Sequence, residues 1–287
     1  MKGSVYRLQP HTPCLLVSNV IVLSILVVSL ISCNKGKVFD ETSTDPTTLV
    51  IRFENKVDTF RFIVDTADYI NSSGNVYKVT DLQYFISDIT LHRSDGAKFI
   101  IQKDYGIHYI DARIPSTLTW LVNTEVPWGT FDSVSFTFGI NEIKNYSNRF
   151  LNPPERDMNW PDVLGGGYHY MKMNILWGRT AQWIPYPFNF HIGIGQIYKG
   201  NVINPDSISS FVQNYFDVNL PASGFSLTES HVKYMVISMN VNKWFTGNNQ
   251  FDFSKYPNTM MQKQNMMNNA CLNGRKAFSV RFTDKGK

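Results

Sequence analysis

The sequence predicts an all-β protein, an antiparallel β-sandwich or distorted barrel with long loops and one helix near the C-terminus. Roughly ten short apolar segments alternate in polarity and are separated by turn residues, which is typical of antiparallel sheets. Helical periodicity is scarce by comparison. Its clearest instance covers residues 259–272, where methionines share a face and Gly274 follows as a stop signal. These methionines are better explained as a buried helix face than as soft-metal ligands.

Residues 1–32 have the features of a lipoprotein signal peptide. Lysine and arginine precede an aliphatic run from Leu15 to Ile31, and Leu30-Ile31-Ser32-Cys33 resembles a bacterial lipobox. Cys33 is therefore the expected lipidation site and would join the chain to membrane lipid. A plain transmembrane anchor is the alternative, because about 17 to 25 apolar residues suffice to span a bilayer. We expect a chain in the cell envelope, lipid-anchored to the outer membrane, on a face that the sequence leaves open.

The residues after the predicted signal peptide differ in polarity, and this difference predicts the domain organisation. Residues 33–48 are polar and predict a flexible tether, and residues 49–287 predict one β domain with long loops at 145–167 and 242–258. The strands that we expect, in chain order, lie at residues 49–53, 60–64, 76–79, 84–91, 98–101, 107–111, 134–140, 168–177, 188–194, 215–220, 232–241 and 277–282.

Composition and motifs argue against several functions. The net charge is only +4, and the domain has no basic run, so nucleic acid is not an expected partner. The chain has no nucleophile elbow, HExxH, Walker loop, Rossmann fingerprint or CxxC pair, so we do not expect an enzyme. Once Cys14 leaves with the signal and Cys33 is acylated, Cys271 has no partner for an internal disulfide.

Three histidines lie on predicted strands at positions that alternation turns inward. His169 shares its expected face with Met171, His108 shares one with Ile110, and His191 lies among aromatic residues and glycines. Neutral imidazoles from three strands can form a copper or zinc site. Taken one at a time, histidines at such positions are more often structural residues of the core than metal ligands. The sequence does not show whether the three converge.

The loop Met158 to Gly167 is the second unusual element. It ends in three consecutive glycines, which indicate that the backbone approaches another group closely. Trp160 precedes Pro161 and is therefore held extended. The loop either presents the Trp160 ring to a site or caps one end of the sandwich.

Several blocks together resemble the MbnP-like family, in its Bacteroidetes-type lipoprotein branch. The resemblance runs from about Leu49 to the C-terminus, and its most specific block is Leu-x-Tyr-Phe-Ile-Ser-x-Ile-x-Leu at 82–91. The other blocks are Leu49–Phe53, His108…Asp111, Val134–Gly139, Met158…Trp160, Gly167-Tyr168-His169 and Phe190-His191-Ile192-Gly193. The resemblance implies a β-rich periplasmic or surface protein that binds copper and is linked to methanobactin-type copper acquisition.

The resemblance also implies roles for individual residues. Members of the family hold copper with histidines and with a tryptophan that a di-haem peroxidase-like partner oxidises to kynurenine. His108 and His191 match family histidines, and His169 is the implied third. Trp160 matches the first tryptophan of the Met-x-Trp-x-Trp segment, whereas Asp162 stands where the second would be. If the oxidised ring is the second one, this chain cannot form kynurenine.

Three functions remain in view. The first is copper binding through His108, His169 and His191, with Trp160 beside the metal, for copper uptake or handling. The second is a surface module for an organic ligand such as a glycan, which stacking aromatic side chains serve well. Its candidate residues are Trp120, Trp128, Trp183, Tyr186 and Trp244. The third is a structural subunit of an envelope complex, which would present a large apolar patch.

Overall fold

The computed structural model describes residues 48–284, apart from residues 67, 123–125, 179–184, 201, 229–231 and 248. The predicted signal peptide, Cys33 and nearly all of the predicted tether lie outside the described residues. Residues Thr44–Lys287 form one compact unit. None of the helices in the described part of the chain has the length and apolar character needed to cross a membrane.

The described residues form seventeen strands, one α-helix and seven short 3-10 helices. The strands are β1 (Thr48–Val57), β2 (Phe60–Arg61), β3 (Tyr69–Ile70), β4 (Val76–His92), β5 (Lys98–Ile100), β6 (Ile107–Asp111), β7 (Thr119–Val122), β8 (Gly129–Phe131), β9 (Ser133–Phe138), β10 (Met171–Gly178), β11 (Tyr186–Ile192), β12 (Gly195–Tyr198), β13 (Ile208–Val212), β14 (Phe216–Leu220), β15 (Phe225–Leu227), β16 (Val232–Asn240) and β17 (Phe278–Thr283). The α-helix is α1 (Gln264–Gly274), and the 3-10 helices cover Lys103–Gly106, Pro115–Leu118, Glu155–Met158, Asp162–Leu164, Pro205–Ser207, Val241–Phe245 and Phe253–Lys255.

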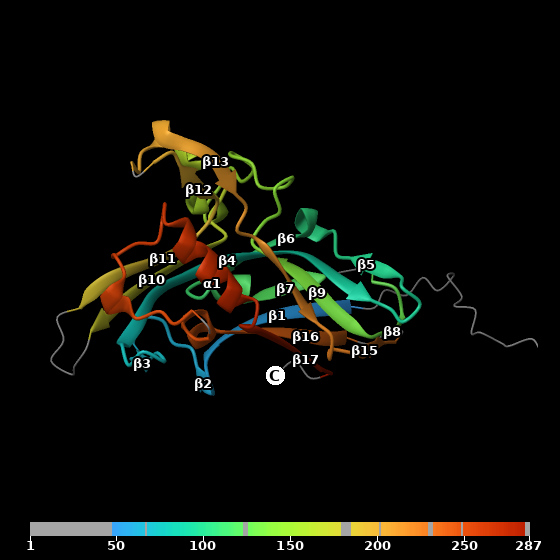
Figure 1. Cartoon of the computed structure of the whole chain (residues 1–287). Helices are drawn as coiled ribbons and strands as arrows, with labels where there is room; N and C mark the ends of the chain where they lie inside the picture. The colour runs from blue at the N-terminus through green and yellow to red at the C-terminus, as the bar shows by residue number, and fades with distance from the viewer. Residues whose placement is uncertain are drawn as a thin grey trace, which may run out of the picture. The chain divides into compact units, whose positions relative to one another are not determined.

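Two large open sheets form most of the fold, and two further two-stranded sheets pair β12 with β13 and β15 with β8 (Figure 1). The larger has eight strands in the order β11-β10-β4-β9-β14, with β3, β5 and β6 also paired to β4. The smaller has five, in the order β17-β16-β1-β2, with β7 paired to β1. This confirms the predicted all-β sandwich, and neither sheet closes into a barrel among the described residues. The strand pairs are antiparallel except β1 and β16, which run parallel.

Aromatic side chains fill the space between the two sheets. Tyr84 on β4 donates a hydrogen bond to Asn55 Oδ1 on β1 at 3.0 Å. Phe138 on β9 packs against Phe278 on β17, with ring centroids 5.7 Å apart. Such aromatic pairs contribute about 0.5–1.5 kcal/mol beyond their buried area. The face of the large sheet that carries Tyr84 and Phe138 is therefore the inner face of the sandwich.

Strand β4 is the centre of the larger sheet. The sequence predicted two strands there, at residues 76–79 and 84–91, but the structure has one strand of 17 residues. The two predicted segments left residues 80–83 outside any strand. Asp81 and Gln83 instead belong to one face of a continuous strand, while Leu82 between them is fully buried.

The register assigns each side chain to a face, because directly opposed residues point the same way. On one face, His108 opposes Ile86 and Ile110 opposes Tyr84, which is the inner face. On the other, Gln83 opposes Lys172, and Lys172 opposes His191. His108 and His191 therefore lie on opposite faces of the same sheet.

The connection between β9 and β10 covers the outer face of the large sheet. Phe85, which alternates with Tyr84 on β4, stacks on Phe150 from this connection with ring centroids 5.5 Å apart. Its ring also meets Tyr168 edge-on at 6.2 Å. Both faces of the large sheet are thus buried, one by the second sheet and one by a long loop.

Helix α1 is shorter than predicted. It begins at Gln264 instead of residue 259, because Thr259 pairs with Asn189 and Gln262 adopts a left-handed conformation with φ of 61°. Its buried side includes Met267, Ala270 and Cys271, which confirms the predicted apolar face.

Candidate metal centre

Two histidines and one tryptophan meet on the outer face of the large sheet. The rings of His169 and His191 have centroids 5.3 Å apart and are nearly perpendicular, at 83°. The Trp160 ring stands edge-on to His169 at 4.6 Å. Exposed fractions are 6% for His169, 9% for His191 and 1% for Trp160. This cluster joins three of the four residues that the sequence predicted for a metal site.

The cluster depends on where β10 begins. The sequence predicted a strand from residue 168, which would have placed His169 on the face of Met171. The strand starts at Met171 instead, and the chain bends at Tyr170, whose N–H donates to Ile192 O at 2.7 Å. His169 precedes this bend, so alternation does not apply to it and its ring reaches the outer face beside His191.

Glycines allow the loop to lie close to the sheet. A Cβ at Gly193 would stand 2.4 Å from Cε3 of Trp160, so the indole packs directly on the backbone. Gly167 has φ of +73°, and a Cβ there would lie 2.6 Å from Asn145 Oδ1. Gly167 O also accepts the Trp160 N–H at 2.8 Å. The loop therefore covers the outer face of the large sheet and places the Trp160 ring against His169.

Asp162 has a structural contact in the same loop. Its Oδ1 accepts a hydrogen bond from Ser147 Oγ at 2.5 Å, and Ser147 Oγ also accepts the Gly167 N–H at 3.0 Å. Where the resemblance places a second tryptophan, this chain therefore has a carboxylate that ties two parts of the loop together.

Both histidines of the cluster are neutral over a wide pH range. Burial lowers the pKa of His169 to about 3, with the neighbouring His191 as the second cause. Burial also lowers the pKa of His191 to about 4, with Lys172 contributing. A desolvated imidazole favours its uncharged form because the charged form loses its hydration.

One nitrogen of each imidazole ring has a hydrogen-bond partner, but the second nitrogen of His191 has none among the described residues. His169 Nδ1 donates to Met158 O at 3.0 Å, and His191 Nε2 lies 2.8 Å from Asn174 Oδ1. His191 Nδ1 is buried and has no hydrogen-bond partner among the described residues. Leaving a buried polar atom unpaired costs about 1–3 kcal/mol, so such an atom calls for an explanation.

His108 does not join the cluster. Its ring is stacked between Phe53 and Trp120, with both centroid distances 4.9 Å, on the inner face of the large sheet. Its Nε2 donates to Thr117 O at 2.8 Å, and burial lowers its pKa to about 4. The prediction of three inward histidines is therefore corrected: only His108 points between the sheets. No group of three His, Cys, Asp or Glu side chains suited to a metal occurs in the part of the chain that the structure describes.

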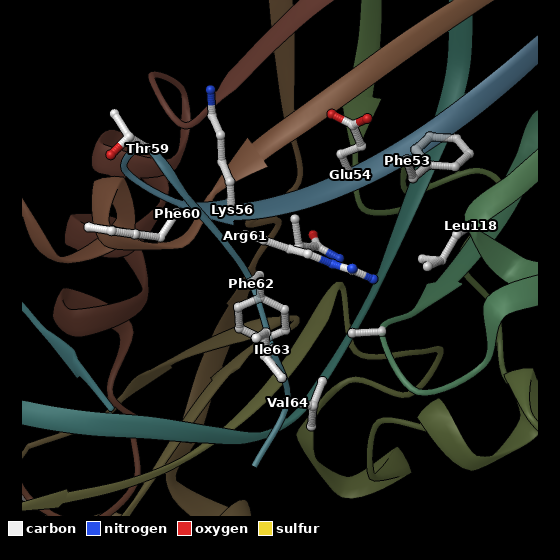
Figure 2. A pocket seen from close by; sticks show the side chains of 12 residues that line it. Phe53, Glu54, Lys56, Thr59, Phe60, Arg61, Phe62, Ile63, Val64 and Leu118 are labelled. Atoms are coloured by element: carbon white, nitrogen blue, oxygen red, sulfur yellow. The ribbon is translucent and has the colours of Figure 1, made fainter. Parts of the chain in front are cut away.

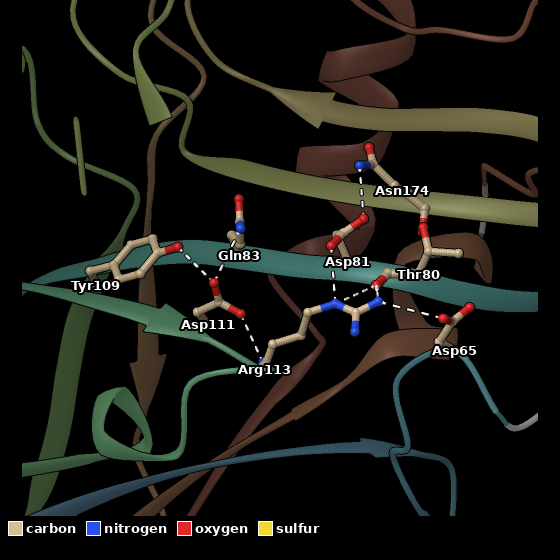
Figure 3. A network of polar contacts seen from close by, with 8 residues as sticks. All are labelled: Asp65, Thr80, Asp81, Gln83, Tyr109, Asp111, Arg113 and Asn174. Carbon is tan, nitrogen blue, oxygen red and sulfur yellow. Dashed lines mark hydrogen bonds and ion pairs between the residues drawn. The ribbon is translucent and has the colours of Figure 1, made fainter. Parts of the chain in front are cut away.

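A polar network beside the cluster escaped the sequence analysis (Figure 3). Asn174 Nδ2 donates to Asp81 Oδ2 at 3.2 Å, and Arg113 Nε donates to Asp81 Oδ1 at 3.1 Å. Asn174 shares a face of β10 with Lys172, and Lys172 opposes His191, so a known register would have placed Asn174 beside His191. The register is not readable from a single sequence, and the network could not be predicted.

Two pockets in the described part of the chain are lined by none of the three cluster residues. One of about 830 Å³ surrounds the β1–β2 hairpin, with Phe53, Glu54 and Arg61 among its lining residues, and none of the predicted site residues lines it (Figure 2). Another of about 580 Å³ is lined by His108 and Trp120 among others.

The predicted ligand-stacking aromatics are only partly available. Trp244 is fully buried in the core, and Trp120 is buried at 3% exposure. Tyr186 is 53% exposed, and Trp183 lies outside the described residues. Burial of Trp120 and Trp244 corrects the expectation that these rings stand ready for a ligand.

Comparison with known proteins gave one family. The MbnP family model matches residues 46–262. The structure is similar to that of MbnP from Methylosinus trichosporium, with a TM-score of 0.48 and 16% sequence identity over 72% of this chain and 83% of that one. No curated protein matches the chain. Because the family model spans most of the sequence, including Trp160, His169 and His191, the chain belongs to the MbnP family.

Proposed function

We propose that this chain binds one copper ion between His169 and His191, with Trp160 alongside, and that it serves copper uptake or handling in the cell envelope. The observation that supports this most directly is the Nδ1 atom of His191, which is buried and has no hydrogen-bond partner among the described residues. His191 is 9% exposed, and a second buried imidazole lies next to it. A metal ion would satisfy that atom.

The hydrogen bonds of His169 support Nε2 as the nitrogen that would bind the metal. A carbonyl oxygen can only accept, so Met158 O requires the proton on Nδ1 and leaves the lone pair on Nε2. Metal-bound histidines usually donate their other N–H in this way to a carbonyl or a carboxylate. Two neutral imidazoles suit copper or zinc, and the choice of copper follows from the resemblance to the MbnP-like family.

The remaining parts of the proposal concern Trp160, Cys33 and a partner. Trp160 would be the ring oxidised to kynurenine by a di-haem peroxidase-like partner. Cys33 would carry lipid and hold the domain at the outer membrane. Mass spectrometry of the peptide that contains Trp160, and of the mature N-terminus, tests both directly. An unmodified Trp160 in protein taken from its native cells would contradict the oxidation.

The copper proposal is tested by metal content and affinity. The chain from Asn34 onward is loaded with Cu(I), Cu(II) or Zn(II), desalted and measured by elemental analysis. We expect about one copper per chain, and an affinity reduced at least tenfold by His169→Ala or His191→Ala, since each removes one of two nitrogen ligands. His108→Ala is the matched control, because His108 is partly buried and also stacks on a tryptophan, yet lies on the opposite face of the sheet.

Two results would contradict the proposal. One is wild-type protein that retains no copper although its circular dichroism shows a folded β protein. The other is an equal loss of copper in His108→Ala and in the two cluster variants, which would indicate a general loss of structure.

An organic ligand such as a glycan remains a second candidate, supported by one observation. The pocket of about 580 Å³ has Tyr105 and Leu151 on its lining, both largely exposed, and the Arg149 guanidinium lies 5.1 Å from the Tyr105 ring centroid. A glycan array would show binding that Tyr105→Ala abolishes. Binding equal to background would count against this candidate.

A further inference from the structure

The network in Figure 3 includes Asn174, and a hydrogen bond between Asn174 Oδ1 and His191 Nε2 joins it to the histidine cluster. Asp81 on β4 is fixed by Arg113, whose Nε donates both to Asp81 Oδ1 at 3.1 Å and to Thr80 O at 3.0 Å. The other oxygen of Asp81 accepts from Asn174 Nδ2 at 3.2 Å. Asn174 Oδ1 in turn lies 2.8 Å from His191 Nε2. Four side chains thus form one continuous chain of hydrogen bonds.

The donors and acceptors of this chain can be arranged in only one way. A guanidinium only donates and a carboxylate only accepts, so the Asn174 group that faces Asp81 is the NH2. The amide oxygen must then face His191, and an amide oxygen only accepts. His191 Nε2 must therefore carry a proton. Its lone pair is left on Nδ1, which is the buried atom without a partner.

We propose that Asn174, held by Asp81, is a positioning residue that fixes the His191 ring with Nε2 protonated and the lone pair of Nδ1 directed into the cluster. The effect on copper rests on the proposed function, whereas the protonated nitrogen and the fixed ring do not depend on any metal. Second-sphere partners of this kind typically change metal affinity about 10–100-fold.

The geometry explains why a polar residue stands at this position of β10. Asn174 opposes Asn189 on β11 and Asp81 on β4, so its amide lies between the two neighbouring strands of the outer face. An apolar side chain there would fill the space but would leave His191 Nε2 without an acceptor.

The test uses the purified full chain in mild detergent, with 15N in its histidines, and reads the ring nitrogens of His191 by NMR without metal. In wild type we expect a protonated Nε2 with slow hydrogen exchange and an unprotonated Nδ1. In Asn174→Leu, which is similar in size, the protected Nε2–H signal disappears and copper affinity falls about 10–100-fold. Asp81→Leu is expected to weaken the protected Nε2–H signal and to lower copper affinity as well.

Rescue and a control separate positioning from general stability. Asp81→Asn combined with Asn174→Asp exchanges the two groups. The amide at residue 81 then accepts from Arg113 through its oxygen and donates its NH2 to the carboxylate at residue 174, which accepts Nε2–H, so the signal returns and copper affinity stays within about threefold of wild type. Gln83→Leu removes another amide of the same face, one that donates to Asp111 and does not contact His191, and leaves both readouts unchanged.

The outcomes separate the two proposals. A protected Nε2–H that survives in Asn174→Leu, or a wild-type ring protonated on Nδ1, overturns the positioning role whatever copper does. The expected NMR pattern in a protein that binds no copper supports the positioning role and overturns the proposed function alone.

Discussion

The indole of Trp160 rests on the backbone of Gly193, so closely that a Cβ at residue 193 would stand 2.4 Å from Cε3 of the ring. This contact joins the loop that covers the large sheet to the chain just after β11, two residues beyond His191. The position of Trp160 beside His169 therefore depends on the absence of a side chain at residue 193.

Gly193→Ala should displace Trp160 and loosen the cluster. Overpacking a buried contact typically costs about 1–3 kcal/mol, and we expect that loss in the free energy of unfolding measured with urea. Tryptophan fluorescence should change as well. Gly224→Ala is the control, because a Cβ there makes only ordinary contacts at 3.4 Å, and it should leave both readouts close to wild type. Equal effects of the two substitutions would contradict the proposed contact.

Gly167→Ala should weaken the loop at its other end. The residue has φ of +73°, and a Cβ would meet the Asn145 side chain, whose Oδ1 accepts the Tyr168 N–H. We expect faster hydrogen exchange at Tyr168 and His169, with a loss of about 1–3 kcal/mol from backbone strain and contact together. Gly74→Ala isolates the strain, because Gly74 has φ of +79° and nothing within 4 Å of its Cβ. We expect Gly74→Ala to lose less free energy of unfolding than Gly167→Ala, and an equal loss would contradict the contact with Asn145.

His108 should make the protein less stable in acid. Its pKa in the folded state is lowered to about 4 by burial, whereas the unfolded chain has the ordinary value of about 6.5. The unfolded state therefore takes up the proton first, so stability is full above about pH 6.5 and falls as pH drops toward 4. The charged groups around the ring are Asp104 and Lys103, with Arg149 and Glu155 on the same pocket.

The measurement compares wild type with His108→Phe, whose ring can stack between Phe53 and Trp120 in the same place. Urea unfolding at pH 7 and pH 5 should show that the variant loses less stability than wild type between these pH values, by on the order of 1–2 kcal/mol. His169 and His191 are present in both proteins, so their contributions to the pH dependence of stability cancel in the comparison. An identical pH dependence would mean that His108 is protonated equally in both states.

Much of the sheet could be predicted from polarity alternation, as the agreement at residues 107–111 shows. The face of the sheet on which each histidine lies could not be predicted in this way. Alternation states which residues of one strand share a face, but both faces of the large sheet are buried here, so an apolar row does not reveal the sandwich interior. His169 lies before a bend at Tyr170, where the period of two no longer holds. Asn174 and Asp81 become partners only through strand register, which a single sequence does not contain.

Cys271 should resist thiol reagents in the folded protein. It lies on the buried face of α1, its Sγ is 3.3 Å from Asn214 O, and burial raises its pKa to about 12. The thiolate is the reactive form, and at pH 8 this shift makes it rarer by well over 100-fold than in a free thiol of pKa 8.5. Alkylation with iodoacetamide, followed by mass spectrometry of the peptide with Cys271, should be at least roughly 100-fold slower in buffer than in denaturant. Comparable rates in the two conditions would show that α1 opens readily and that Cys271 is not held in the core.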